Sequence, residues 1–231
     1  MTEARKNSVY SSFMFLKLQP EFRRLQHNEK IAAKQEFENM VGSAQEKLFL
    51  RTYMVAGLRF DADILFWRMS DDLQYLQEIG ARTFSSGAGR YFTPSFCYLG
   101  VSRQPALSPS ERDPDFKFLP KETFGRHRYL LLHPVIKAHA WHELPDSERE
   151  LLHAERARVA EKYTGIQENF FMSCGLDEPD MIVAREAKSL EELTAATQEL
   201  RRQRIKSYTV EDKPVFLCVG RDLREIMDAV S

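Results

Sequence analysis

The sequence lacks most of the features that mark secreted, membrane-spanning or nucleic-acid-binding proteins. No run of 18 or more apolar residues occurs in its 231 residues, so we expect no membrane-spanning helix. The three cysteines lie far apart without CxxC spacing, and the first residues show no secretory signal pattern. A formal net charge of −1 is too small to attract nucleic acid or anionic lipid. We therefore predict a cytoplasmic protein without nucleic-acid or membrane partners.

Common catalytic signatures are missing as well. The sequence contains no G-x-G-x-x-G, Walker, G-x-S-x-G or H-E-x-x-H motif, and the glycines at 87–89 are interpreted as a loop. Five of the six histidines fall between residues 127 and 153, but His139 and His142 have no further ligand at a recognised metal-site spacing. Scattered histidines are the simpler interpretation, and a non-heme metal site stays open as an alternative. Its candidate ligands are His133, His139, His142, Glu143 and Glu168.

Prolines mark one compositional boundary in the chain. Four of the ten prolines lie between residues 101 and 125, among serines and charged residues. Proline fixes φ and has no N–H to donate, so this stretch is predicted to be a linker rather than a helix or strand. The linker divides the chain into an N-terminal half, residues 1–100, and a C-terminal half, residues 126–231.

The two halves show the same order of apolar runs and helical stretches. The first half has a run at Val9–Leu18, a helix at 28–45, runs at Leu48–Val55 and Asp63–Met69, a helix from Ser70 and a run at Ser95–Val101. The second has a run at His127–Ile136, a helix at Ser147–Tyr163, runs at Ile166–Cys174 and Met181–Arg185, a helix from Ser189 and a run at Pro214–Val219. Each half therefore predicts a βαββαβ unit. The predicted fold class is α+β, with two tandem ferredoxin-like repeats of the dimeric α+β barrel type.

Local signals support these repeats. Gly57 and Gly175 each separate two predicted strands, where a tight turn requires positive φ. Ser70, Ser147 and Ser189 each precede acidic residues and are predicted helix N-caps.

A basic run follows the last long helical stretch. It consists of Arg201, Arg202, Arg204 and Lys206. A solvated helix end accounts for it, because cations are favourable near the C-terminal end of the helix dipole. A clamp for an anion or a propionate group is the alternative.

Several motifs, in the same order along the chain, carry a family resemblance. They are Val55–Trp67 (VAGLRFDADILFW), His133–Lys137 (HPVIK), Trp141, Leu144–Arg149 (LPDSER), Gly175–Glu178 (GLDE) and residues 199–209. On these motifs, from about residue 8 to residue 220, the chain resembles the chlorite dismutase and coproheme decarboxylase family. The resemblance implies two fused ferredoxin-like halves, homo-oligomeric rings that are commonly pentamers, and heme or iron coproporphyrin in the C-terminal half.

The resemblance places an arginine where the family has its heme-ligating histidine. Counting without gaps from Pro145 to Tyr163 puts that position at Arg156, and a guanidinium has no lone pair to give to iron. His153 lies three residues earlier on the same predicted helix, about 300° and 4.5 Å away in helical geometry. Arg156 is thus expected to contact a cofactor without ligating it, and His153 is the candidate metal ligand.

Two positions that the resemblance assigns to catalysis also differ. The family's decarboxylases have a tyrosine before the proline of the second motif, where this chain has His133, which lacks a phenol to oxidise. Counting back from the GLDE stretch puts Glu168 at the distal position, held by arginine in chlorite dismutases and by glutamine in decarboxylases. A carboxylate there would repel an anionic oxidant such as chlorite at close range. Lys137, Trp141 and Tyr98 are expected to contact the cofactor.

Three functions stay open on these grounds. The first is a heme- or coproheme-dependent, peroxidase-like oxidoreductase with His153 as an unconventional ligand. The second is a family member that has lost heme and acts as a ring-forming scaffold or binding module, and the third is the non-heme metal site. The substitutions predict that standard chlorite dismutase or coproheme decarboxylase activity is impaired, so whether the chain is an enzyme stays open.

Overall fold

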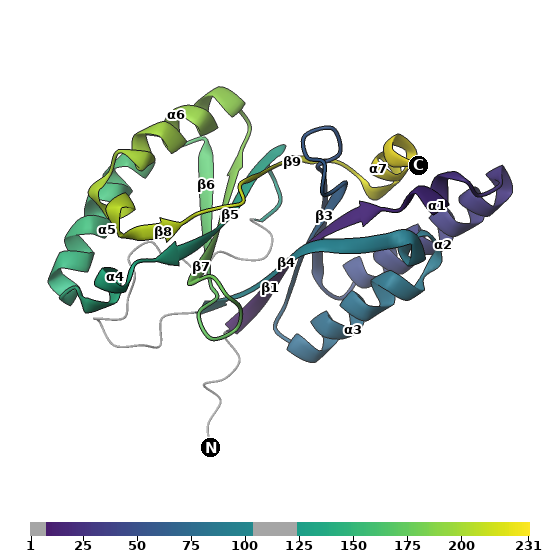
Figure 1. The fold of residues 1–231 in the computed structure, drawn as a ribbon, viewed down its shortest axis with the longest axis horizontal. Helices are drawn as coiled ribbons and strands as arrows, with labels where there is room; N and C mark the ends of the chain where they lie inside the picture. Colours follow the sequence, from purple (N-terminus) through teal and green to yellow (C-terminus); the bar gives the residue numbers. More distant parts are fainter. Residues whose placement is uncertain (1–7, 104–123) are drawn as a thin grey trace, which may run out of the picture. The chain divides into compact units, whose positions relative to one another are not determined.

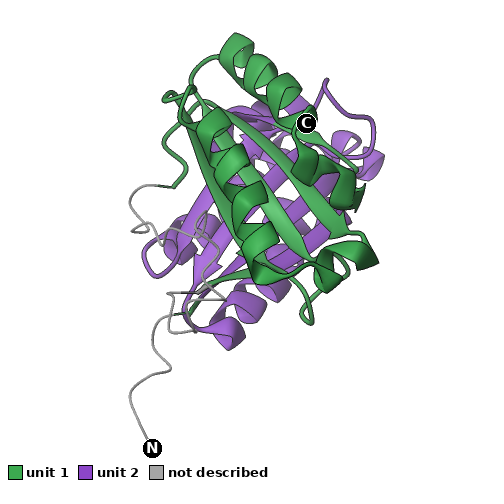
Figure 2. Cartoon of the chain, turned by 90° about the vertical axis from the view of Figure 1, so that its left-hand side faces the viewer, with its two compact units in different colours: residues 1–8, 100–217 green, residues 9–99, 218–231 purple. Residues whose placement is uncertain are grey.

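The computed structural model of the chain describes residues 8–103 and 124–231 and divides into two compact units (Figures 1 and 2). Of the described residues, 9–99 and 218–231 form the N-terminal unit, and 8, 100–103 and 124–217 form the C-terminal unit. The predicted linker at 101–125 lies largely outside the described residues, and its first three residues end a strand. No helix in the described part of the chain combines the length and the apolarity needed to cross a membrane.

The N-terminal unit is a sheet with helices packed on it. Its sheet contains β1 (Ser8–Leu18), β2 (Phe49–Met54), β3 (Ile64–Ser70), β4 (Phe92–Arg103) and β9 (Phe216–Gly220), in the order β4-β1-β3-β2-β9. The last residues of β4 and the first residues of β9 are counted with the C-terminal unit. Its helices are α1 (Pro20–Arg23), α2 (His27–Gln45), α3 (Leu73–Ser85), the short 3-10 helix Gly87–Tyr91 and α7 (Leu223–Val230). Phe13 and Phe15 of β1 and Phe66 and Trp67 of β3 are fully buried.

The C-terminal unit repeats this plan. Its strands are β5 (Tyr129–Lys137), β6 (Ile166–Met172), β7 (Met181–Ala187) and β8 (Thr209–Glu211). β7 pairs antiparallel with both β5 and β6, and β8 pairs with β5. Its helices are α4 (His139–Glu143), α5 (Asp146–Ala160), α6 (Leu190–Arg201) and the 3-10 helix Arg204–Tyr208. Figure 2 shows α5 and α6 over one face of these strands.

The repeat extends to individual hydrogen bonds. The Asp63 carbonyl oxygen accepts from the N–H of Val55 at 2.9 Å, and the Asp180 carbonyl oxygen accepts from the N–H of Ser173 at the same distance. The carboxylates of these aspartates accept from the N–H groups of Leu18 and Lys137, at 2.9 and 2.6 Å. The predicted fold class, two ferredoxin-like α+β repeats, is confirmed.

The two glycines of the repeat adopt the backbone conformation expected of them. Gly57 has φ of 80° and Gly175 has φ of 79°, each in the turn between two strands. The three predicted N-caps fare differently. The Ser189 hydroxyl does accept from the N–H of Glu192, but Asp72 rather than Ser70 caps α3, and α5 already begins at Asp146, so Ser147 lies inside that helix.

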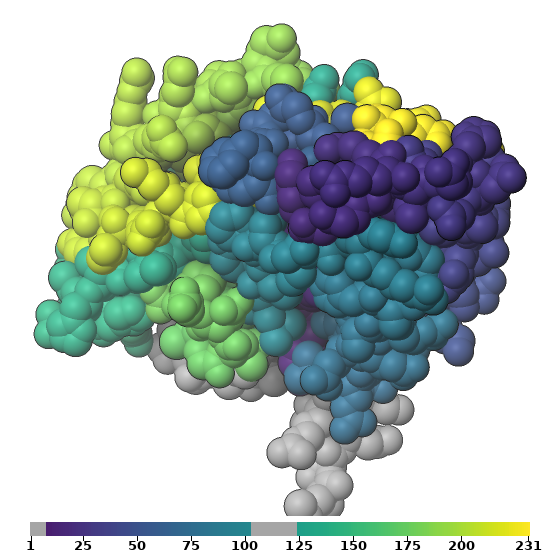
Figure 3. Space-filling view, turned by 45° about the vertical axis from the view of Figure 1, so that its right-hand side comes forward, coloured from purple at the N-terminus to yellow at the C-terminus, as the bar shows by residue number. Residues whose placement is uncertain are grey.

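The C-terminal end of the chain belongs to the N-terminal unit, although the sequence halves place it in the other one. Helix α7 contributes Leu223, Ile226 and Met227 to the core that also contains Phe22. Arg23 donates from Nε to the carbonyl oxygen of Val230 at 3.1 Å. Figure 3 shows the yellow C-terminal residues lying against the purple N-terminal ones. The first and last described elements of the chain therefore stabilise the same unit.

Candidate functional site

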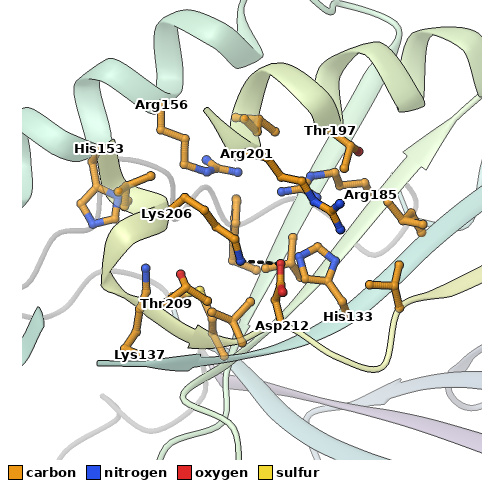
Figure 4. Close-up of a pocket in the computed structure, with 18 residues that line it drawn as sticks. His133, Lys137, His153, Arg156, Arg185, Thr197, Arg201, Lys206, Thr209 and Asp212 are labelled. Carbon is orange, nitrogen blue, oxygen red and sulfur yellow. Dashed lines mark ion pairs between the residues drawn. The ribbon is translucent and has the colours of Figure 1, made fainter. Parts of the chain in front are cut away.

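A pocket in the C-terminal unit lies between the sheet, helices α5 and α6, and the segment 204–215 (Figure 4). Its volume is about 110 Å³. The polar and charged lining residues are His133, Lys137, His153, Arg156, Arg185, Thr197, Arg201, Lys206, Thr209 and Asp212. The rest of the lining is apolar, including Leu131, Val135, Phe170, Val183, Leu200 and Ile205.

Strand and helix periodicity explain why these side chains meet. The lining residues of β5 are Leu131, His133, Val135 and Lys137, and those of β7 are Met181, Val183 and Arg185. Alternate residues of a strand point to one face, so each strand presents its odd-numbered positions to the pocket. On the other side, His153 and Arg156 are three residues apart on α5, as are Thr197 and Leu200 on α6, a spacing that puts each pair on one helix face.

The Arg156 side chain, at the position where the resemblance implies an iron ligand, is paired with Glu168. Glu168 lies on β6 directly opposite Arg185 on β7, and its two oxygens accept hydrogen bonds from Arg156 and Arg185. The side chains of all three are 9–10% exposed. The Arg156 guanidinium also lies 4.6 Å from the centre of the Phe170 ring. This buried Arg156–Glu168–Arg185 cluster joins helix α5 to the sheet.

The charge of Glu168 is compensated on both sides. Burial alone raises the pKa of this carboxyl, but the charges of Arg185 and Arg156 and their hydrogen bonds outweigh burial and leave the pKa below its ordinary value. Glu168 is therefore ionised at neutral pH. We expected Glu168 to repel an anion in the pocket. Because two guanidinium groups contact the carboxylate and compensate its charge, this repulsion is weaker than for an unpaired carboxylate.

His133 is buried in the pocket as a neutral imidazole. Burial, followed by the positive charges of Arg185, Lys206 and Arg156, holds its pKa well below the usual value. Its side chain is 7% exposed, and its Nδ1 atom has no hydrogen-bond partner among the described residues. Figure 4 shows Arg201 reaching down from α6 toward the His133 ring.

The remaining pocket cations differ in their partners. Lys206 pairs with Asp212 at 2.6 Å, the dashed line in Figure 4. The Lys137 ammonium lies 4.1 Å from the centre of the Trp141 ring, which is buried beside the pocket. Arg201 forms no ion pair with any carboxylate of residues 8–103 and 124–231. Five lining cations face two carboxylates, Asp212 and the adjoining Glu168, so the pocket is strongly positive.

The pocket residues do not fit a heme held in the way the resemblance implies. Arg156 offers no lone pair, and its guanidinium is engaged by Glu168. His153 does line the pocket, with its ring edge-on to Trp141 at 5.4 Å. The volume of about 110 Å³ is also well below the roughly 300–1,000 Å³ typical of pockets for drug-sized ligands. A porphyrin would have to displace side chains that are now paired.

Other predicted site residues are not among those that line this pocket. Tyr98 belongs to the N-terminal unit, where its ring stacks on Phe96 at 6.4 Å, and its role at a cofactor stays a prediction. His139 lies 3.4 Å from Glu143 on exposed α4, and His142 lies 3.8 Å from Asp180. Within the described ranges, no group of three or more His, Cys, Asp or Glu side chains could hold a metal ion. The candidate ligands of the non-heme metal site are thus not brought together.

Sequence reasoning missed part of this pocket. Arg185 was not among the predicted site residues. Its position as a charged residue in the largely apolar stretch MIVAREA was a signal that it has a buried partner. Within the basic run, Arg201 and Lys206 line the pocket, as the anion-clamp alternative required. Arg204 instead pairs with Glu155 at 3.1 Å on the surface. The basic run is therefore divided between the pocket lining and the protein surface.

Comparisons with known proteins agree on one family. The family model described as chlorite dismutase matches residues 30–221. A curated relative, the coproheme decarboxylase of Mycolicibacterium smegmatis, is 28% identical over 169 residues, which cover 71% of this chain and 69% of the relative.

Solved structures show the same fold. A mutant chlorite dismutase from Candidatus Nitrospira defluvii superposes with a TM-score of 0.85 at 22% identity, covering 99% of this chain and 97% of the other. A heme-binding protein from Thermus thermophilus superposes with a TM-score of 0.82 at 20% identity, covering 96% of each chain.

Proposed function

Since the chain belongs to the chlorite dismutase family, we propose that its C-terminal pocket is a binding site, and that it holds an anionic ligand rather than an iron bonded to helix α5. The observation that carries this proposal is the buried Arg156–Glu168–Arg185 cluster. The cluster includes Arg156, at the position where the family resemblance implies the iron ligand. At that position the pocket is lined by a cationic side chain instead of a histidine that could bind iron.

The pocket chemistry suits a carboxylate or phosphate group. Arginine presents a planar fork of N–H donors that matches such groups, and Arg201 is not committed to another carboxylate of the described residues. Lys206 and Lys137 add positive charge around it. An anion entering the pocket would therefore gain charge-assisted hydrogen bonds without breaking the Arg156–Glu168–Arg185 cluster.

Calorimetric titration with acetate and with inorganic phosphate tests this proposal. We expect binding that weakens as salt is added, because ions screen partly exposed charges. In Arg201→Gln the affinity is expected to fall severalfold. Arg202→Gln is the matched control, since Arg202 is a neighbouring exposed arginine that does not line the pocket. If the protein binds no small carboxylate and no phosphate, the proposal is wrong.

Heme or iron coproporphyrin is the second candidate ligand. Relatives named as a coproheme decarboxylase and a heme-binding protein favour it, and so do two pocket histidines, His133 and His153. The neutral imidazole of His133 keeps a lone pair that a metal ion could accept. Peroxide-dependent oxidoreductase activity would require that one of these rings reaches the iron.

Titration with hemin and with iron coproporphyrin separates the two candidates. A Soret band typical of histidine ligation, lost in His153→Ala or His133→Ala and kept in His139→Ala, would support the second candidate. An unshifted spectrum would end it. When peroxide is added to the protein mixed with iron coproporphyrin, the mass of the porphyrin is expected to stay unchanged, because His133 has no phenol to oxidise.

A ring assembly is proposed on the family resemblance. The expected particle is a homopentamer, with a mass of five times the 26.9 kDa of one chain. Light scattering on the eluting protein measures this mass directly. If the protein forms a ring but binds neither porphyrin nor small anions, the scaffold function is the alternative that remains. A monomeric mass would contradict the proposed ring.

A further inference from the structure

The proposed anion site has an apolar wall, and this feature narrows the class of ligand. Leu131, Val135 and Val183 line it from the sheet, and Leu200 and Ile205 line it from α6 and the 3-10 helix that follows. A site built only for inorganic phosphate would not need these side chains. A ligand that touches both walls carries an apolar body as well as a charge.

The pocket volume limits that body. An apolar cavity of about 150 Å³ is known to accept one benzene ring. The pocket here, at about 110 Å³, is slightly smaller and is partly open, so a single ring or a short alkyl chain is the largest body that fits without rearrangement.

Two side chains define where the charged end lies. Arg201 is the pocket arginine outside the Arg156–Glu168–Arg185 cluster, and it points toward His133 (Figure 4). His133 is buried, and its Nδ1 atom lacks a hydrogen-bond partner within the described part of the chain. A neutral imidazole carries one N–H and can donate it to an oxygen without adding charge. A carboxylate between the two side chains would accept from both.

We propose that the pocket binds a small monocarboxylate with an apolar body of about one ring, of the benzoate or hexanoate class, and that Arg201 and His133 hold its carboxylate. This inference rests on the proposed function and names the ligand class of the same site. Lys206 stays paired with Asp212 beside the carboxylate. The Arg156–Glu168–Arg185 cluster closes the pocket toward α5 and is not opened by the ligand.

The experiment compares benzoate with acetate and with benzamide by calorimetric titration. Full burial of a phenyl-sized group is worth about ten- to hundredfold in affinity, so benzoate is expected to bind at least about tenfold more tightly than acetate. Benzamide has the same shape without the charge and is expected to bind more weakly than benzoate. Arg201→Gln is expected to weaken benzoate binding about tenfold and to leave benzamide binding unchanged, whereas Arg202→Gln changes neither.

A second variant tests the role of His133. His133→Leu keeps an apolar side chain in the core and is expected to reduce the preference for benzoate over benzamide, while thermal unfolding checks that the variant is folded. Equal binding of acetate and benzoate, both sensitive to Arg201→Gln, would overturn this inference and leave the anion site standing. Absence of binding by acetate, phosphate and benzoate alike would overturn both.

Discussion

At the scale of single residues, one carboxylate holds the buried cluster of the C-terminal unit together. Glu168 neutralises two arginines that are otherwise buried together, one on α5 and one on β7. Placing an imidazole at residue 156 would therefore not restore an iron ligand by itself, because Glu168 would still occupy the space in front of it. Arg156 and Glu168, which both differ from the pattern that the family resemblance implies, are therefore coupled to each other and to Arg185.

Glu168→Gln is expected to destabilise the protein strongly. Removing one partner of a buried ion pair leaves uncompensated charge and costs about 3–5 kcal/mol. The control is Glu199→Gln, since Glu199 pairs with Lys162 on the surface, where loss of the pair is expected to change stability little. Urea unfolding of both variants measures the difference. Equal, small effects would show that the cluster does not stabilise the fold.

His133 makes stability depend on pH on the acid side of neutrality. Its pKa is well below the unfolded value of 6.5, so between these two values the unfolded chain binds a proton that the folded chain does not. Stability is then complete above about pH 6.5 and falls as the pH is lowered, by up to about 1.4 kcal/mol per pH unit for one proton.

The matched variants for this effect are His133→Leu and His139→Gln. His133→Leu is expected to flatten the dependence between roughly pH 6.5 and 5, whereas His139→Gln, on exposed α4, leaves it as in the parent protein. Urea unfolding at a series of pH values gives the slopes. Parallel curves for His133→Leu and the parent would show that the imidazole is protonated in the native state.

At the scale of helices and strands, most of the architecture could be predicted from the sequence. Apolar runs and the two glycine turns located β2, β3, β6 and β7, because strand alternation and positive φ are local properties. Helix starts were less well predicted, since a serine and an aspartate two residues apart compete for one cap. At α3 the aspartate, Asp72, accepts from two N–H groups and Ser70 does not cap the helix.

The candidate site could be predicted only in part. The family resemblance indicated that Arg156 stands where the family has its heme-ligating histidine, but not which residue pairs with its charge. The partner is Glu168 on strand β6, 12 residues further along the chain. Cross-strand register, which places Glu168 opposite Arg185, depends on the folded sheet and is not visible in local spacing.

Two glycines test how closely the elements of the N-terminal unit pack. A Cβ at Gly89 would lie 1.8 Å from the carbonyl oxygen of Thr83 and 2.8 Å from the Phe37 ring, so Gly89→Ala is expected to cost about 3 kcal/mol or more. Gly42, in α2, has no atom within 4 Å of such a Cβ, and Gly42→Ala is expected to stabilise the helix by about 0.5–1 kcal/mol. Thermal unfolding of the two variants measures both the expected loss of stability in Gly89→Ala and the expected gain in Gly42→Ala. A tolerated Gly89→Ala would mean that the 3-10 helix shifts freely.

At the scale of the whole chain, the two repeats have a buried arginine at the same strand position but different residues opposite it. Arg68 and Arg185 each lie five residues after the repeated aspartate, on β3 and β7. Opposite Arg185 is Glu168, but opposite Arg68 is Leu50. Arg68 is buried, and burial lowers its pKa to about 10. It donates to the Ser12 hydroxyl at 3.0 Å, while its Nε and Nη1 have no partner among the described residues.

This asymmetry predicts opposite effects of one substitution in the two units. Arg68→Met removes a buried charge that no carboxylate of the described residues compensates and is expected to leave stability unchanged or raise it by about 1–4 kcal/mol. Arg185→Met removes one of two partners of buried Glu168 and is expected to lower stability by several kcal/mol. Denaturant unfolding of the two variants measures the contrast. If Arg68→Met were the more damaging, the guanidinium would have to be held by a partner from outside the described residues. The N-terminal unit would then contain a compensated buried charge, as the C-terminal unit does.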